Sequence, residues 1–258
     1  MFFVINKEKL SAYIVSIATV LVLFVMAGVV MPTGNTIETS SNIQKQLPIY
    51  NVQTEEKKVA LTMNCAWNAD DIDSILKTLS ENNVKITFFV VGEWIDKYPE
   101  AVEKIYKSGN EIGSHSNTHP HVCNLSYEEN IEEIERCNDK IEKIISKRTT
   151  LYRTPYGEYN DTVILAAKDK GYYTIQWNID TLDYNSLTGE EMWKRIEVKL
   201  SKGSIILSHN GTEHTADSLD MIIKRIKSKG YEIVPVSNLI YRDNYSINGN
   251  GTQIKTNE

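Results

Sequence analysis

Residues 113–121 read Gly-Ser-His-Ser-Asn-Thr-His-Pro-His and follow a short run, Glu111 and Ile112, that is typical of a strand end. The stretch places His115 and His119 four residues apart. A loop that leaves a strand end can direct two imidazoles at one point, as a metal site requires. A solvated loop is the alternative for an isolated His-x-x-x-His, but the chain's five histidines fall into two clusters, which favours a site.

Strand-like and helix-like segments alternate on both sides of this stretch. Residues 86–91 (ITFFVV) have the β-branched and aromatic content of a buried strand, and residues 69–82 keep apolar side chains on one helical face. Capping boxes at Ser126–Glu129 and Thr188–Glu191 mark two further helix starts. About seven β/α units predict an α/β fold with a parallel sheet, in the form of a closed or nearly closed, distorted (β/α)7 barrel.

Polar side chains follow the carboxyl ends of the predicted strands. Barrel enzymes build their active sites at that edge. Any one of these residues could be a surface residue, but together they predict a site. They are Asn64 with Cys65, His115, Arg153, Asp183 and His209.

The length of 258 residues allows one large domain or two small ones. The net charge of -6 and the lack of a basic patch argue against nucleic acid as a partner, so a neutral or weakly charged substrate fits better. Three cysteines allow at most one disulfide, and Cys137 lies at helical spacing with apolar neighbours, which is typical of a core thiol.

The first segment predicts a membrane anchor. No charged residue occurs from Leu10 to Met31, a run long enough to cross a bilayer, and Lys7 and Lys9 precede it. We expect a single-pass protein of the cell membrane with its domain outside; a cleaved signal peptide and a buried core helix are the alternatives. The expected parts are a cytoplasmic N-terminus (1–9), an anchor (10–31), a linker (32–56), the domain (57–241) and a frayed polar tail (242–258).

Four motifs occur in a fixed order in the domain: His115-Ser-Asn-Thr-His119, Arg153-Thr-Pro-Tyr-Gly157, Asp180-Thr-Leu-Asp183 and Leu207-Ser-His209. In this order they resemble the polysaccharide deacetylases of carbohydrate esterase family 4, the NodB-homology domain, over about residues 57–241. Tyr184 follows the third of them where Trp is usual. The Ala-Trp pair after the first strand most resembles the sporulation-associated PdaB branch.

The resemblance implies hydrolysis of the N-acetyl group of a cell-wall glycan. His115 and His119 would hold a divalent ion, most often zinc. His209 would be the general acid, with Asp183 and Arg153 as its orienting and tuning partners. The backbone N–H of Tyr156 is expected beside the developing oxyanion, and Leu207 and Trp177 would wall the acetyl pocket unless they only pack in the core. The implied substrate contacts are therefore Pro155, Tyr156, Leu207 and Trp177.

The first motif of the family, Thr-Phe-Asp-Asp, reads Thr62-Met-Asn-Cys65 here. Asn64 stands at the position of the general base, and a neutral amide cannot take a proton from water; losing a general base costs about two to four orders of magnitude in rate. Cys65 stands at the position of a metal-binding carboxylate, so we expect a His-His-Cys site, with an unligated thiol as the alternative. Asp70 or Asp71 could supply a base, or could be charges at a helix start.

Two hypotheses follow. The first is a membrane-anchored, metal-dependent peptidoglycan-type N-deacetylase with altered or reduced catalysis. The second is a catalytically silent domain of the same fold that binds glycan or metal in the cell envelope. A soluble cytoplasmic enzyme is a third reading, which the predicted anchor opposes.

Overall fold

The main sheet of the computed structural model is parallel, as the sequence predicts. Its central strand, β2 (Lys58–Cys65), pairs with β3 (Thr87–Val90) on one side and β8 (Ile205–His209) on the other. The order along the sheet is β6-β5-β4-β3-β2-β8-β7, and β9 pairs with the start of β2. The remaining strands of the sheet are β4 (Glu111–Ser114), β5 (Leu151–Tyr152), β6 (Tyr173–Thr174), β7 (Ile179–Asp180) and β9 (Glu232–Ile233).

The sheet is curled but not closed, which excludes the closed form of the predicted closed or nearly closed barrel. Strands β6 and β7 end the order and are not neighbours in it. The segment 49–52 lies at this opening, because Ile49 forms a bridge with Ile175 and Asn51 forms one with Ser204. Ile49 and its neighbour Val52 are buried, so the folded domain begins before residue 57, within the segment expected to be a linker.

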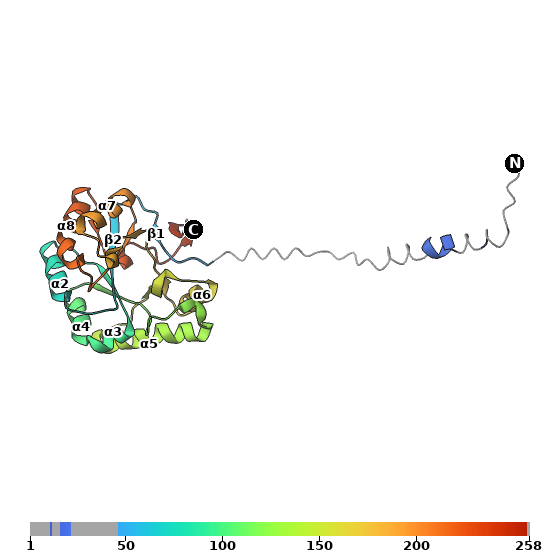
Figure 1. Ribbon diagram of the computed structural model, residues 1–258, viewed down its shortest axis with the longest axis horizontal. Coiled ribbons are helices and arrows are strands. Elements are labelled where there is room, and N and C mark those ends of the chain that lie inside the picture. The colour runs from blue at the N-terminus through green and yellow to red at the C-terminus, as the bar shows by residue number, and fades with distance from the viewer. Residues whose placement is uncertain (1–10, 12–15, 22–45, 257–258) are drawn as a thin grey trace. The chain divides into compact units, whose positions relative to one another are not determined.

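Helices cover the outside of the sheet (Figure 1). Both predicted capping boxes are present, and they begin α5 (Tyr127–Ile145) and α7 (Gly189–Lys199). Short α3 (Gly92–Lys97) was not predicted, because six residues are too few to establish a helical period. The other helices are α2 (Ile72–Glu81), α4 (Pro99–Lys107), α6 (Asp161–Asp169) and α8 (Thr215–Ser228).

The side chains of β2 alternate between two environments, as the period of a strand requires. Leu61, Met63 and Cys65 pack in the apolar cluster that also holds residues of the covering helices. Ala60 packs in the second cluster, and Asn64 is hydrogen-bonded to Arg153 on that inner side. The last two residues of β2 therefore point to opposite faces of the sheet.

The C-terminal residues belong to the fold, which corrects the prediction of a frayed tail. Strands β10 (Tyr245–Ile247) and β11 (Thr252–Lys255) form a hairpin that pairs with β1 (Asn51–Val52). Gln253 is fully buried, and its amide donates to the carbonyl of Tyr241 and accepts from the N–H of the same residue. One satisfied amide thus ties the hairpin to the domain.

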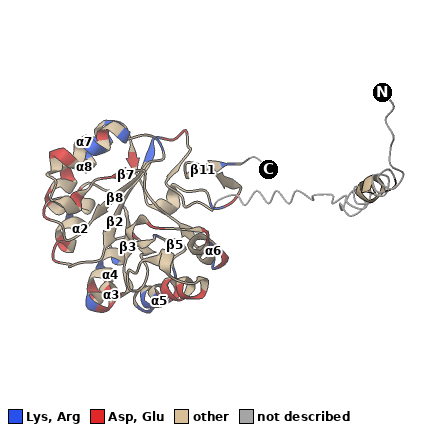
Figure 2. Cartoon of the chain, turned by 45° about the vertical axis from the view of Figure 1, so that its right-hand side comes forward, with Lys and Arg blue, Asp and Glu red and all other residues tan. Residues whose placement is uncertain are grey.

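The structure describes residue 11, residues 16–21 and residues 46–256. Most of the predicted anchor and linker lie outside the described residues. Within the described ranges, no helix has both the length and the apolar character needed to cross a bilayer. Figure 2 shows Lys and Arg interspersed with Asp and Glu on the helices, while β2, β3 and β8 at the centre are mostly tan, the colour of the other residues.

Candidate active site

A cavity of about 840 Å³ opens at the carboxyl ends of the strands. It brings together eight of the eleven residues that the sequence places in a site. Arg153 and Pro155 are buried beside it rather than in its lining, and Cys65 is elsewhere. The eight lining residues are Asn64, His115, His119, Tyr156, Trp177, Asp183, Leu207 and His209.

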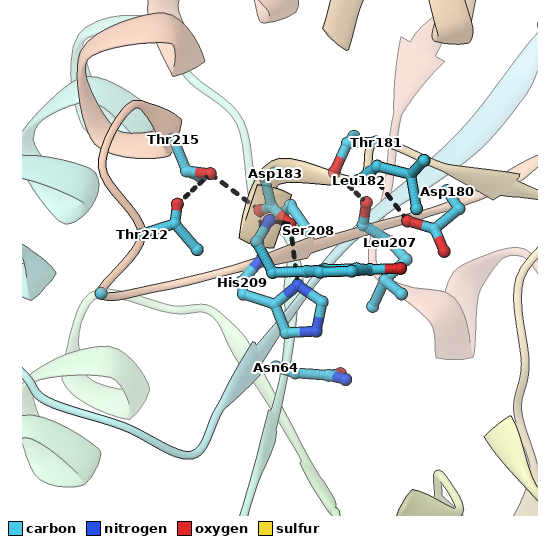
Figure 3. Close-up of polar contacts among 12 residues, drawn as sticks. Asn64, Asp180, Thr181, Leu182, Asp183, Leu207, Ser208, His209, Thr212 and Thr215 are labelled. Carbon is cyan, nitrogen blue, oxygen red and sulfur yellow. Dashed lines mark hydrogen bonds and ion pairs between the residues drawn. The ribbon is translucent and has the colours of Figure 1, made fainter. Parts of the chain in front are cut away.

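His209 and Asp183 form a hydrogen-bonded pair on one side of the cavity. His209 ends β8, and its Nδ1 lies 2.8 Å from Oδ1 of the buried Asp183. Asp183 also accepts hydrogen bonds from the backbone N–H of His209 (2.6 Å) and from the hydroxyl of Thr215 (2.7 Å). Because the carboxylate holds the Nδ1 proton, the other ring nitrogen faces the cavity on the side of Asn64 (Figure 3). This is the arrangement that a histidine needs to donate a proton to a leaving group.

His115 and His119 face each other across the loop that follows β4, with ring centroids 4.8 Å apart. Burial lowers the pKa of His115 well below its usual value, and the adjacent His119 lowers it further. Burial also lowers the pKa of His119. Both rings are therefore neutral at physiological pH, the state in which a histidine can bind a metal.

Glu133 of α5 fixes this loop, a role that the sequence analysis missed. Its Oε2 accepts hydrogen bonds from the hydroxyl of Ser116 (2.5 Å) and from the backbone N–H groups of Asn117 and Thr118 (3.0 and 2.9 Å). Ser116 has a positive φ of 71°, a strained conformation for a residue other than glycine. A carboxylate that satisfies several loop donors stabilises such a backbone and, with it, the position of both histidines.

Arg153 lies under the cavity floor and is fully buried. It donates to Thr62 Oγ1 (2.9 Å), to Asn64 Oδ1 (3.0 Å) and to the carbonyls of Ile175 and Gln176. Burial lowers its pKa to about 9, because these acceptors are neutral and a buried cation is costly to solvate. Arg153 therefore acts on the cavity through Asn64 rather than by lining it.

Cys65 is not placed with the histidines, contrary to the expected His-His-Cys set. Its side chain packs in the core on the helix-facing side of β2, and burial raises the pKa of the thiol well above its usual value. In the part of the chain that the structure describes, no three His, Cys, Asp or Glu side chains cluster as metal ligands would. Catalytic zinc normally takes three protein ligands, so the residues present do not fit such a site.

The two alternative bases are also away from the cavity lining. Asp71 accepts hydrogen bonds from the side chain of Asn210 (3.1 Å) and from the backbone N–H of Gly211 (2.7 Å). Asp70 is exposed at the start of the helical segment. Asp71 therefore stabilises the loop that follows β8, and neither carboxylate lines the cavity.

Aromatic rings surround the cavity mouth. Trp67 lies over His209 with centroids 5.3 Å apart and planes at 31°, and Tyr184 meets the same ring edge-on at 5.4 Å. On another side, Tyr156 stacks on His121 at 4.4 Å with planes at 14°. Trp67, Tyr156 and Tyr184 are 49%, 58% and 46% exposed. The sequence analysis noted the Ala-Trp pair but did not place Trp67 in the site.

The fold and the order of the site residues agree with the resemblance to polysaccharide deacetylases, apart from the altered first motif. The polysaccharide deacetylase family model matches residues 51–175. A solved CE4 family pseudoenzyme from Bacillus anthracis is 31% identical, with a TM-score of 0.73, over 76% of this chain and 69% of that one. A mutant of that pseudoenzyme with restored enzymatic activity is equally similar.

The chain belongs to the polysaccharide deacetylase family, whose members are hydrolases of carbon–nitrogen bonds other than peptide bonds and are generally metal-dependent. It is 33% identical to the uncharacterized protein YlxY of Bacillus subtilis, over 75% of this chain and 60% of the relative. It is 35% identical to the peptidoglycan-N-acetylmuramic acid deacetylase PdaC of the same organism, over 73% of this chain and 40% of the relative. The chain thus spans less than two thirds of these two proteins.

The buried histidine predicts a pH-dependent stability. Because the folded pKa of His115 is lowered, the unfolded chain binds more protons once the pH falls below about 6.5, the usual value for histidine. The free energy of unfolding should therefore fall with decreasing pH below this value, by up to about 1.4 kcal/mol per pH unit for this residue. Denaturant unfolding between pH 5 and 7 should show a smaller slope for His115→Gln. The exposed His121, changed to Gln, serves as the control, and equal slopes in the parent and His115→Gln would contradict the assignment.

The position of Cys65 predicts an effect on stability and none on metal binding. Cys65→Ser buries a hydroxyl in an apolar cluster and should lower the free energy of unfolding by about 1–3 kcal/mol. The zinc affinity, measured by titration, should stay that of the parent. Cys123→Ser, at a partly exposed thiol, is the control. If the zinc affinity falls in Cys65→Ser but not in Cys123→Ser, the Cys65 thiol is a metal ligand and this prediction is wrong.

Proposed function

We propose that this cavity binds N-acetylated glycan of the peptidoglycan type and that the chain hydrolyses its N-acetyl groups slowly or not at all. The observation that carries the proposal is the asymmetry of the cavity. The Asp183–His209 pair is intact on the acid side, while Asn64 stands where a base is needed. Without a carboxylate at that position, water is activated poorly although a leaving amine could still be protonated.

The aromatic rim supports a glycan as the ligand. Exposed Trp and Tyr side chains at a cavity mouth offer flat apolar faces and hydrogen-bonding edges, which suit a sugar ring with one apolar face. Relatives such as PdaC are named for their action on peptidoglycan, and we extend this substrate class to the present chain as part of the proposal.

Residual hydrolysis and silence are two forms of this function. The intact acid side favours residual hydrolysis. Two observations favour the silent form: the histidines lack a third ligand among the described residues, and the solved neighbours include a pseudoenzyme. The proposal has three further parts that rest on the sequence alone. The chain is anchored in the membrane through residues 10–31, its domain lies outside the cytoplasm, and it belongs to the sporulation-associated branch.

Trp67→Ala tests whether the cavity binds glycan. Loss of one stacking face of about 0.5–1.5 kcal/mol should weaken the binding of an N-acetylglucosamine tetramer by roughly 2- to 12-fold in calorimetry. Tyr106→Ala removes an exposed ring of α4 that lines a different cavity and should leave the affinity unchanged. Equal affinities in the parent and Trp67→Ala would take Trp67 out of the site, and no binding by the parent would refute the proposed ligand.

Asn64→Asp tests the chemistry. It restores a carboxylate at the base position, so acetate release from N-acetylglucosamine oligomers and peptidoglycan should rise by roughly two to four orders of magnitude. Adding His209→Ala to Asn64→Asp should abolish the gain, because the acid would then be missing. Release above the His209→Ala background in the parent identifies the slow enzyme, and binding without release identifies the silent form. A parent as fast as Asn64→Asp would contradict the proposal.

A further inference from the structure

Three buried residues form a chain of hydrogen bonds across the cavity floor. Asn64, His115 and Arg153 are 4%, 2% and 0% exposed. Arg153 Nη1 lies 3.0 Å from Asn64 Oδ1, and Asn64 Nδ2 lies 3.2 Å from His115 Nε2. The chain closes on itself, since His115 Nδ1 lies 2.9 Å from the carbonyl oxygen of Arg153.

The chemistry of these groups determines where each proton lies. A guanidinium only donates, so the amide oxygen of Asn64 must face Arg153 and its NH₂ group must face His115. A carbonyl only accepts, so Nδ1 of His115 carries the ring proton. Because the NH₂ group of Asn64 can only donate, Nε2 of His115 must be the acceptor of that hydrogen bond, so the ring is neutral in this arrangement.

We propose that Asn64 excludes divalent metal from this site by occupying the lone pair of His115 Nε2. A neutral imidazole has a single lone pair for either a hydrogen bond or a metal. To bind an ion through Nε2, the chain must break the bond to Asn64 and leave a buried NH₂ group unpaired, which is unfavourable. The amide of Asn64 therefore has two effects: it cannot act as a base, and its hydrogen bond occupies the nitrogen of His115 that would bind the ion.

A carboxylate in the same place would have the opposite effect. An aspartate at position 64 could still accept from Arg153, but it has no donor for His115 when ionised. His115 Nε2 would be free, and a negative charge would lie beside it, which favours a cation. The single change from amide to carboxylate therefore decides whether the two histidines face a hydrogen-bond donor or an ion.

Zinc titration of the purified full-length chain tests this inference, independently of any sugar. Asn64→Ala removes the donor and should bind zinc about tenfold more tightly than the parent, the equivalent of one recovered hydrogen bond. Asn64→Asp keeps the side-chain volume and the acceptor for Arg153, and should bind more tightly still. Asn210→Ala is the matched control, because it removes another buried amide, one that donates to Asn68 and Asp71, and should behave as the parent.

The inference is overturned if the parent binds zinc as tightly as Asn64→Ala and Asn64→Asp. It is also overturned if Asn210→Ala gains affinity to the same degree, since the effect would then follow from loosened packing. Circular dichroism shows which variants are folded. If Asn64→Ala fails to fold, the comparison of zinc affinity is made between the parent and Asn64→Asp. In the tighter variants, adding His119→Ala should remove the gain; a gain that survives it places the ion elsewhere and contradicts the proposal.

Discussion

The buried guanidinium of Arg153 is the constraint on which the cavity depends. A cation in the protein interior must find acceptors, and this one finds them on the ends of separate strands: Thr62 and Asn64 of β2, and the backbone after β6. Its own carbonyl accepts the proton of His115. A single residue therefore joins the central strand, the edge strand and the histidine loop. Its position also dictates how the amide of Asn64 is oriented.

Under the proposed function, the two halves of the cavity differ in how much of the deacetylase chemistry they retain. On one half, the carboxylate of Asp183 orients His209 and is itself held by Thr215, as Figure 3 shows. On the other half, a hydrogen bond between Asn64 and His115 stands where the family places a base and an ion. Such a site can retain the shape and the aromatic rim for a sugar while its hydrolytic step is impaired.

The sequence predicted the parts of the site that depend on strand ends. His115, Asp183 and His209 meet in one cavity because the carboxyl ends of parallel strands meet at one edge. The prediction for Cys65 was wrong because it rested on the position of this residue in the motif. Adjacent residues of a strand face opposite sides of the sheet, so Cys65 and Asn64 cannot both face the cavity. The parallel sheet was correct, whereas its open edge could not be predicted, since it depends on how residues 49–52 fill the gap. The roles of Glu133 and Gln253 depend on contacts between residues that are distant in sequence. The composition of residues 242–258, rich in Asn and Gly, did not predict the β10–β11 hairpin.

The most direct measurement is the ¹⁵N NMR spectrum of the His115 side chain in the full-length chain, assigned by comparison with His115→Gln, before and after zinc is added at a concentration that saturates Asn64→Asp but lies well below the Kd of the parent. The hydrogen-bond chain between Arg153, Asn64 and His115 requires the proton on Nδ1, an acceptor signal for Nε2, and no change of either on adding zinc. A proton on Nε2, or a zinc-dependent shift of that nitrogen in the parent, would contradict the account. Either result would mean that the amide of Asn64 does not hold the place of the ion.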